Sequence, residues 1–486
     1  MTIKFLKKIT TVGVLAASLG FTACKDFLDV NTDPNRLADA PLTTQLPGTQ
    51  FAAGTAHYGA AFSISQITQQ IAGAGGGGTD SHNEIRLGGT WTSVYLNGMT
   101  NLYDIIKNAD AAKSPHYSGV AKVMIALNLG LATDIWGDVP YSEAINLAKS
   151  FYPKFDAQQE VYQKIPVLLD EAIVNLNEAN SAFSPKSDDL MYGGVRTKWV
   201  KLARALKARY AIHLSKKGGK AAADAALAAL AAGAMVDNAD DLQLNYALNS
   251  LNPWHLVATG NNTGNLTVRH AEQLADAMNG TTLGVWDPRL PRIAGVRGTT
   301  VNTWKGNRSG EGTGGVLDFL VTSWHSTPSA PILMMTFSEQ KFIEAEARFI
   351  SNGGNQTSTG STAEAYAAYI AGIDANMKKL GVLDTGRLRY LADPKVAVGA
   401  ANLQLTHIMT EKWKALFLQP EAWTDMRRYD YLPTIYKDLA LPFGHNPSLG
   451  GQWIRRSQYP LDEFSRNSEQ VRKVEKKLQD KMWWDE

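Results

Sequence analysis

Residues 199–214, WVKLARALKARYAIHL, decide the fold class of this chain. Apolar side chains recur there at three- and four-residue spacing with basic side chains between them, which is the pattern of an amphipathic helix. The same spacing runs from Val161 to Leu176. Further stretches predicted to be helical are 91–112, 118–133, 221–234, 336–350, 362–380 and 403–418. Because strand-like alternation is scarce, we expect an all-α architecture of packed helix pairs.

Long polar and glycine-rich connections interrupt these helices at three places. They run from Gly73 to Gly89, over about 245–335, and over 441–460. Irregular segments of this length are uncommon in compact domains and are often functional. The sequence has no fixed-period repeat and no clear linker. We therefore expect residues 24–486 to form a single domain, in which a helical scaffold carries a loop-rich lobe at about 245–335.

The composition excludes several classes of protein. With 486 residues, of which 44% are hydrophobic and 19% charged, the chain can bury a large core and is too apolar to be disordered. Its one cysteine, Cys24, cannot form an internal disulfide. Three lysines and no acid precede Cys24, so the 48 basic and 46 acidic residues of the whole chain become 45 and 46 without that segment. Such a near-neutral chain lacks the charge that binds nucleic acid.

Residues 1–23 have the features of a lipoprotein signal peptide. Three lysines precede a short apolar stretch, Ile9 to Leu19, which is too short to span a bilayer as a permanent helix. The stretch Phe21-Thr22-Ala23-Cys24 resembles a lipobox, with phenylalanine where leucine is more usual. We therefore expect cleavage before Cys24 and lipidation of its sulfur, and we expect that no later segment is apolar for long enough to span a membrane. The acyl chains would anchor the protein stably, because each buried methylene contributes about 0.8 kcal/mol.

Motifs for nucleotide binding and catalysis are incomplete or absent. Gly73 to Gly78 satisfies G-x-G-x-x-G, but residues 67–71 before it look helical and no helix opens directly after it. A dinucleotide site needs a strand before the glycines and a helix after them, so we interpret this segment as a surface loop. No G-x-S-x-G, H-E-x-x-H or phosphate loop occurs, and we expect His213 to be a core residue. The sequence therefore predicts neither an enzyme nor a bound cofactor.

Two groups of oxygen and nitrogen ligands raise the question of a metal site. Asp29 to Asn35 alternates acidic and amide residues as a calcium loop does, but Pro34 stands where that loop requires glycine. A turn is the simpler interpretation of this segment. Asp80, His82 and Glu84 also alternate, but three polar residues in a glycine-rich loop are weak support for a site. We predict no metal.

Aromatic side chains stand out among the small polar residues of the loop-rich lobe. Trp254, Trp304, Trp324 and His325 are each flanked by asparagine, serine, threonine or histidine. The flat faces of tryptophan suit sugar rings, whose C–H faces stack while their hydroxyls bond to nearby polar groups, and they also suit peptides. These four residues are the predicted ligand contacts. The alternative is that the tryptophans anchor the loops onto the scaffold.

Six segments carry a further pattern, and they are distributed along almost the whole chain after residue 23. They are Cys24-Lys25-Asp26-Phe27-Leu28-Asp29 with Asp33-Pro34-Asn35, the stretch 120–144 containing Trp136-Gly137-Asp138-Val139-Pro140, Trp286-Asp287-Pro288-Arg289-Leu290, Phe342 to Arg348 containing Glu344-Ala345-Glu346-Ala347, Glu411-Lys412-Trp413 to Trp423-Thr424-Asp425-Met426-Arg427-Arg428, and Arg455-Arg456 to Tyr459-Pro460. In this order they resemble the SusD/RagB-like outer-membrane nutrient-binding lipoproteins of Bacteroidetes, and most closely the shorter, starch-binding-associated branch.

This resemblance implies both a fold and a function. It implies helix pairs similar to tetratricopeptide repeats, and a surface lipoprotein that sits as a lid over a SusC-like TonB-dependent transporter and delivers oligosaccharides to it. It implies that shared motif residues such as Trp136, Trp413, Arg427 and Arg428 pack or pin helices, with arginine forks to carboxylates as one device. Ligand residues of this family lie on variable loops, so the resemblance does not supply them.

Three alternatives remain open from the sequence. The ligand of the lid could be an oligopeptide, as in some members of the resembling family. A surface glycoside hydrolase or peptidase with an unfamiliar site is the competing class, although nothing in the sequence supports catalysis. The third alternative is a purely structural lid without ligand affinity.

Overall fold

The computed structural model describes residues 40–145, 150–298 and 303–486. Leu42–Glu486 form one compact unit. The predicted signal peptide, residues 1–23, and the predicted lipidation site Cys24 lie outside the described residues. So does the candidate calcium loop at Asp29 to Asn35.

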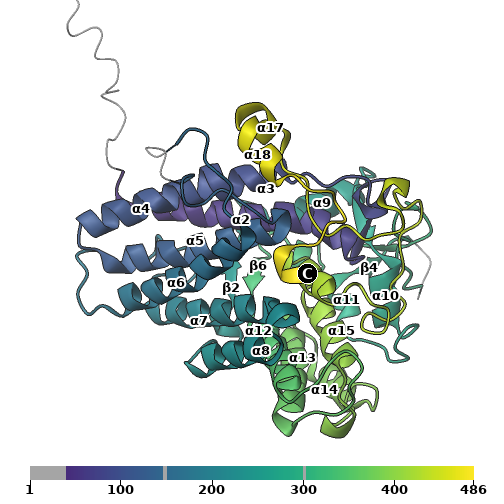
Figure 1. Cartoon of the computed structure of the whole chain (residues 1–486). Helices are drawn as coiled ribbons and strands as arrows, with labels where there is room; N and C mark the ends of the chain where they lie inside the picture. Colours follow the sequence, from purple (N-terminus) through teal and green to yellow (C-terminus); the bar gives the residue numbers. More distant parts are fainter. Residues whose placement is uncertain (1–39, 146–149, 299–302) are drawn as a thin grey trace, which may run out of the picture. The chain divides into compact units, whose positions relative to one another are not determined.

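The predicted all-α architecture of packed helix pairs is confirmed. Successive helices lie side by side in the order of the chain, from α4 through α8, and then continue into α12 and α13 (Figure 1). This is the arrangement of helix-pair solenoids such as tetratricopeptide repeats. The helices of this scaffold are α4 (Thr100–Ala111), α5 (Pro115–Trp136), α6 (Gln158–Asn177), α7 (Arg196–His213), α8 (Ser215–Ala231), α12 (Phe337–Ser351) and α13 (Ala363–Lys379).

Helix α5 is the centre of the scaffold because it packs between α4 and α6 and buries almost every side chain. Among the described residues it is also the one helix long and apolar enough to cross a membrane. The expectation that no later segment has this composition was therefore wrong. The helix is 94% buried inside the protein over its most apolar window, which is typical of a core helix.

The first helix of the unit, α2 (Leu42–Ile67), was not predicted. It contains Pro47 and several glycines and threonines, which lower the helix propensity of its sequence. The helix packs on α4, α5 and the π-helical turn Ser93–Met99, which follows α3 (Gly88–Thr92). The predicted helix 91–112 is thus α3, this π-helical turn and α4 in succession.

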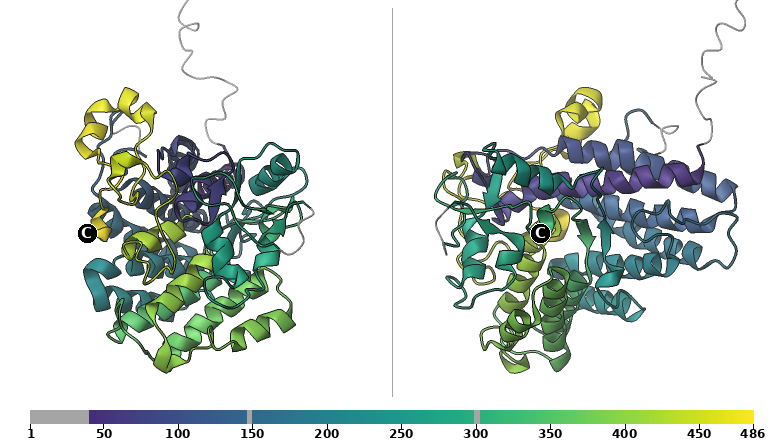
Figure 2. Two further views of the ribbon diagram at one scale, coloured as in Figure 1. Left: turned by 90° about the vertical axis from the view of Figure 1, so that its right-hand side faces the viewer. Right: turned by 180° about the vertical axis from the view of Figure 1, so that it is seen from behind.

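The lobe at about 245–335 combines short helices with short antiparallel strands. Most of it lies at one end of the helical scaffold, on the right in Figure 1, where α10 and β4 are labelled (Figures 1 and 2). Its helices are α9 (Pro253–Asn262), α10 (Glu272–Asn279) and α11 (Leu290–Ile293). Within the lobe, β4 (Gly295–Val296) pairs with β5 (Leu317–Asp318). The other two lobe strands pair with strands from outside it: β3 (Val268–His270) with β1 (Ile71–Gly73), and β6 (Ile332–Met335) with β2 (Leu242–Leu244).

Strand β1 corrects the sequence interpretation of the glycine-rich loop. The stretch 67–71 ends a helix and enters a strand, so the loop at Gly73 to Gly78 does follow a strand. Only the short 3₁₀ turn η1 (Thr79–Ser81) comes after it. The second requirement of a dinucleotide site, a helix that opens at the glycines, is therefore not met.

The C-terminal third closes the unit. Helices α14 (Asp384–Ala392), α15 (Leu405–Ala415) and α16 (Glu421–Arg428) follow α13, and α16 contacts α2, α7 and the final turn η7 (Trp483–Asp485). The irregular segment 441–460 leads to α17 (Leu461–Arg466) and α18 (Ser468–Val474). Trp484 is fully buried although it lies two residues from the end.

Candidate functional site

Trp254 lies in the hydrophobic core and not at an open surface. Its indole is 2% exposed and packs at 5.4 Å, ring centre to ring centre, on Phe319 and at 6.0 Å on Phe62. Asn252 caps α9 by accepting a hydrogen bond from the Trp254 backbone N–H at 2.6 Å, which fixes the start of the helix. The indole therefore presents no open face to a ligand, contrary to the prediction for this residue.

Trp324 and His325 lie together in the short turn η4 (Trp324–Ser326) but differ in exposure. His325 is buried, and burial lowers its pKa to about 3, so the ring is neutral at physiological pH. It contacts Trp324 on one side at 4.7 Å and Phe417 on the other at 5.2 Å. Trp324 is half-buried. His325 is thus a buried ring that packs against Trp324, and of the two residues only Trp324 retains appreciable accessible surface.

Trp304 forms an aromatic pair with Trp286, which was not predicted as a ligand contact. The ring centres lie 5.4 Å apart in an edge-to-face arrangement. Trp286 is 38% exposed and Trp304 is half-buried. Asn279 holds the Trp304 segment by donating to its backbone carbonyl at 2.9 Å. Among the described residues, the ring contacts of Trp304 join it to Trp286 and not to Trp254 or Trp324.

Trp286 stands directly before two of the most strongly fixed residues of the protein, Asp287 and Arg289. Arg289 donates to both oxygens of Asp287, at 2.9 and 2.5 Å, and both side chains are fully buried. Arg289 and Lys414 outweigh the effect of burial and hold the pKa of Asp287 at about 2. The motif at 286–290 indicates scaffold packing, so Trp286 is not among the ligand contacts predicted from the sequence. The buried ion pair of Asp287 and Arg289 thus fixes the chain directly after Trp286.

We call residues 281–285, the segment that leads into Trp286, the strap. Two cavities of similar size adjoin it. One cavity, of about 300 Å³, is lined by Thr281 and Thr282 of the strap together with Arg308 and Phe443. The Arg308 guanidinium lies 5.3 Å above the centre of the half-exposed Phe443 ring. The second cavity, of about 290 Å³, lies behind Leu283 and Val285 of the strap.

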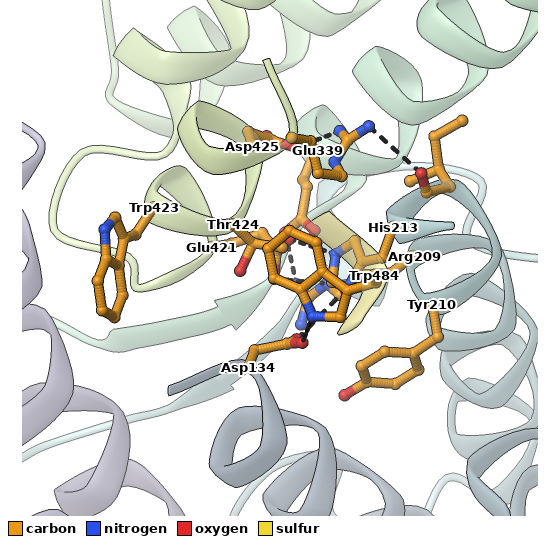
Figure 3. A network of polar contacts seen from close by, with 12 residues as sticks. Asp134, Arg209, Tyr210, His213, Glu339, Glu421, Trp423, Thr424, Asp425 and Trp484 are labelled. Carbon is orange, nitrogen blue, oxygen red and sulfur yellow. Dashed lines mark hydrogen bonds and ion pairs between the residues drawn. The ribbon is translucent and has the colours of Figure 1, made fainter. Parts of the chain in front are cut away.

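A buried ion-pair network connects the scaffold to the C-terminal third (Figure 3). His213 of α7 lies at its centre, with Nε2 2.5 Å from Glu421 and Nδ1 3.4 Å from Asp134. Trp484 donates its indole N–H to Asp134 at 3.1 Å, and Arg209 pairs with Glu339 at 2.6 Å. The prediction that His213 is a core residue is confirmed.

Asp134, His213 and Glu421 place three potential metal ligands within 4.8 Å of one another, but their chemistry is that of ion pairing. Burial lowers the pKa of His213, yet Glu421 and Asp134 together raise it to about 9, so at neutral pH the imidazole is a cation that pairs with both carboxylates. The adjoining cavity, of about 20 Å³, has room for about one water molecule. The network therefore pins helices together.

Charged residues of two other motifs, at 342–348 and 411–428, also make structural contacts. Arg428 forms a fork on Glu346, at 2.6 and 3.1 Å, as the resemblance implied. Glu344 pairs with Lys341 at 2.8 Å on the helix surface. These carboxylates of α12 are consequently not free to act on a sugar bond.

Asp80, His82 and Glu84, the alternating residues that follow the glycines of the loop, each make different contacts. Asp80 accepts backbone N–H groups from Gly73 and Gly310, at 2.9 and 2.7 Å, and so closes the loop. His82 is buried against the rings of His445 and Trp453, and Glu84 is an exposed partner of Arg86. The prediction of no metal at this loop stays a prediction.

The scaffold buries motif residues such as Arg427 and Arg428, and the attached lobe carries the Trp286–Trp304 pair, an arrangement that suits a binding protein. A model of the SusD-like family described as starch-binding, associating with the outer membrane, matches residues 49–460. The chain therefore belongs to this family of binding proteins, which are not enzymes. Membership makes it an outer-membrane-associated carbohydrate-binding protein at the level of the family.

Solved structures similar to this chain have the same fold. A chitin-binding protein is 25% identical with a TM-score of 0.73, and the match covers 92% of this chain and 100% of that one. A SusD homologue from Bacteroides uniformis is 22% identical with a TM-score of 0.75, covering 92% and 100%. A chitin-binding SusD homologue from Flavobacterium johnsoniae is 22% identical with a TM-score of 0.72, covering 92% and 97%. No curated relative matches the sequence.

Proposed function

We propose that this protein is a cell-surface lipoprotein that captures oligosaccharides and passes them to a SusC-like TonB-dependent transporter. The observation that carries the proposal is the Trp286–Trp304 pair on the lobe, in which Trp286 is 38% exposed. Two indoles nearly at right angles offer one face to stack on a sugar ring and one edge to bracket it. Arg308 and the strap threonines line a separate cavity of about 300 Å³, where they offer further hydrogen-bond donors for hydroxyl groups.

Trp304 and Trp286 are the proposed primary contacts, and Trp324 is the proposed secondary one, with His325 in a supporting position. Trp254 contributes to the packing beneath the lobe. The protein acts by binding and release, without turnover of the glycan, and requires neither a metal nor a cofactor. Transport energy acts on the transporter, so affinity for the glycan stays modest enough for release.

Membrane attachment rests on the sequence of the first 24 residues. We propose that residues 1–23 are removed, that Cys24 is lipidated, and that residues 24–486 form the single folded domain facing the cell exterior. Cys24→Ala should move the protein from the membrane fraction to the soluble fraction. Retention of that variant in the membrane would contradict lipid anchoring at this residue. Co-purification of a TonB-dependent barrel with the membrane-extracted wild-type protein tests the partner.

The glycan proposal is tested by affinity electrophoresis of the mature protein against starch, chitin, xylan and pectin, with mixed oligopeptides in a parallel calorimetric titration. Trp304→Ala and Trp286→Ala should each weaken glycan binding about tenfold or more, because truncating an aromatic anchor costs over about 1.4 kcal/mol. Phe183→Ala is the matched control, since Phe183 is 60% exposed outside the lobe. Binding to peptides alone would replace the sugar proposal with an oligopeptide-binding lid. Unchanged binding in both tryptophan variants would exclude the pair as the site.

A further inference from the structure

The cavity behind the strap is separate from the Trp286–Trp304 pair and has its own chemistry. Its walls are mostly apolar and aromatic. They are formed by Leu283 and Val285 of the strap, Val396 and Val398 of the segment after α14, and the rings of Tyr369 and Tyr390. Its volume of about 290 Å³ equals the share of about ten water molecules in the liquid, which is the size of a small organic molecule with one ring.

Two polar atoms of residues that line this cavity, the Tyr369 hydroxyl and Nε2 of the half-buried His407, have no protein partner among the described residues. Tyr369 is 1% exposed, and its hydroxyl makes no hydrogen bond within the part of the chain that the structure describes. Most buried polar side-chain atoms are hydrogen-bonded, so this hydroxyl is available to a ligand. His407 accepts the Gln404 backbone N–H on Nδ1 at 3.0 Å. In the neutral ring the proton is then on Nε2, which makes that nitrogen a donor.

The charged residues that line the cavity favour an anion. Lys395 donates to the Gly284 carbonyl at 2.7 Å, and Lys437 donates to the Thr282 carbonyl at 2.7 Å. These carbonyls are two residues apart on the strap, and both lysines line the cavity with exposed side chains. Each ammonium has three N–H donors, and each therefore keeps donors for another acceptor.

The only acid among the described residues lining this cavity, Glu411, does not cancel that charge. It accepts from Lys414 at 2.7 Å and from Tyr390 at 2.8 Å, and it pairs with Arg289 at 2.5 Å. Arg289 and Lys414 also pair with Asp287, so this buried cluster holds two positive and two negative charges and is neutral. The net charge left along the cavity lining is that of the two lysines.

We propose that this cavity is a second binding site, for a small carboxylate carried on a compact apolar body such as one aromatic ring. The carboxylate lies between Lys395 and Lys437, and the ring packs against Tyr369, Tyr390 and the valines. The Tyr369 hydroxyl and the His407 Nε2–H bond to any further oxygen of the ligand. The site does not depend on glycan binding at the Trp286–Trp304 pair.

The test compares two probes of one shape, 3-phenylpropanoate and its neutral amide, by saturation-transfer NMR and calorimetric titration of the mature lipoprotein in detergent. We expect the carboxylate to bind at least tenfold more tightly than the amide. The double variant Lys395→Gln/Lys437→Gln should lose this preference. Absence of binding by both probes, or equal binding of both to the wild type, would overturn the proposal.

A matched pair of tyrosine variants on α13 locates the site. Tyr369→Phe removes the unpartnered hydroxyl without breaking a protein hydrogen bond, so the melting temperature should stay the same while competition by 3-(4-hydroxyphenyl)propanoate weakens several-fold. Tyr366→Phe, on the same helix but outside the cavity lining, should change neither. Val398→Trp should fill the cavity and abolish binding of both probes. Trp304→Ala should bind them normally, which separates this proposal from the glycan site, and binding that survives Val398→Trp would place the probe elsewhere.

Discussion

The ion pairs of His213 predict how the stability of the protein depends on pH. Burial lowers the pKa of this imidazole, but Glu421 and Asp134 more than compensate and raise it to about 9, against 6.5 in the unfolded chain. A group with a raised folded pKa stabilises the protein fully below its unfolded pKa and loses that contribution as the pH rises through its folded pKa. The stabilisation from His213 should therefore be complete below about pH 6.5 and disappear around pH 9.

The expected size follows from the two pKa values. Their difference corresponds to roughly 3 kcal/mol, at about 1.4 kcal/mol for each pKa unit. Most of this free energy is still present at pH 7, and nearly all of it is lost by pH 10. No reduction for solvent screening applies, because the His213 side chain is fully buried.

The assay is urea unfolding of the wild type and of His213→Gln at pH 6, 7, 9 and 10. The wild type should lose about 2–3 kcal/mol more than the variant between pH 7 and pH 10, since glutamine does not titrate. Subtracting the variant removes the contribution of other groups that ionise in this range. Parallel pH profiles for the two proteins would refute the reasoning. So would an NMR titration that places the pKa of His213 near 6.5.

Three further outcomes follow from particular contacts. Arg428→Met removes the bidentate partner of the buried Glu346 and a partner of the buried Asp425, leaves both carboxylates to Lys412, and should lower the free energy of unfolding by about 3–5 kcal/mol in urea; a loss under 1 kcal/mol would contradict this. Gly137→Ala should cost about 1–3 kcal/mol in the same assay, because φ is +91° and the new methyl would meet the buried Arg456 at 2.3 Å, whereas Gly399→Ala should cost less, since nothing lies within 4 Å of the methyl that it adds. Trp484→Ala should lower the free energy of unfolding by about 3–5 kcal/mol by emptying a buried site, and an unchanged melting temperature would show that the final turn is dispensable.

The helical scaffold was predictable because amphipathic spacing is strong wherever one face of a helix is exposed. Helices α6 and α7 show this directly. Helix α2 escaped prediction because it buries polar residues such as Gln50, His57 and Gln66 as well as alanines, so its sequence has no polar face to set against an apolar one. Short strands such as β1 could not be predicted either, since three residues carry too little alternation.

The candidate site was predictable only in part. An aromatic residue among polar neighbours in sequence can lie on a surface, as Trp304 partly does, or in the core, as Trp254 does. Sequence does not distinguish these cases, because burial depends on residues such as Phe62 and Phe319 that are distant along the chain. Trp286 was hidden by the motif that follows it. The cavity behind the strap joins segments more than 100 residues apart and left no local pattern.

The buried turn η7 has a consequence for any chain that lacks it. Trp484 supplies one of the hydrogen bonds of Asp134, and Asp485 pairs with Lys216 at 3.1 Å, so this turn completes polar contacts of residues that are distant along the sequence. Without the turn, the scaffold would hold charged groups that it cannot bury in satisfied form. A cleavage of the chain just before Trp483 would therefore be felt in α5 and at the start of α8, and not only where the chain is cut.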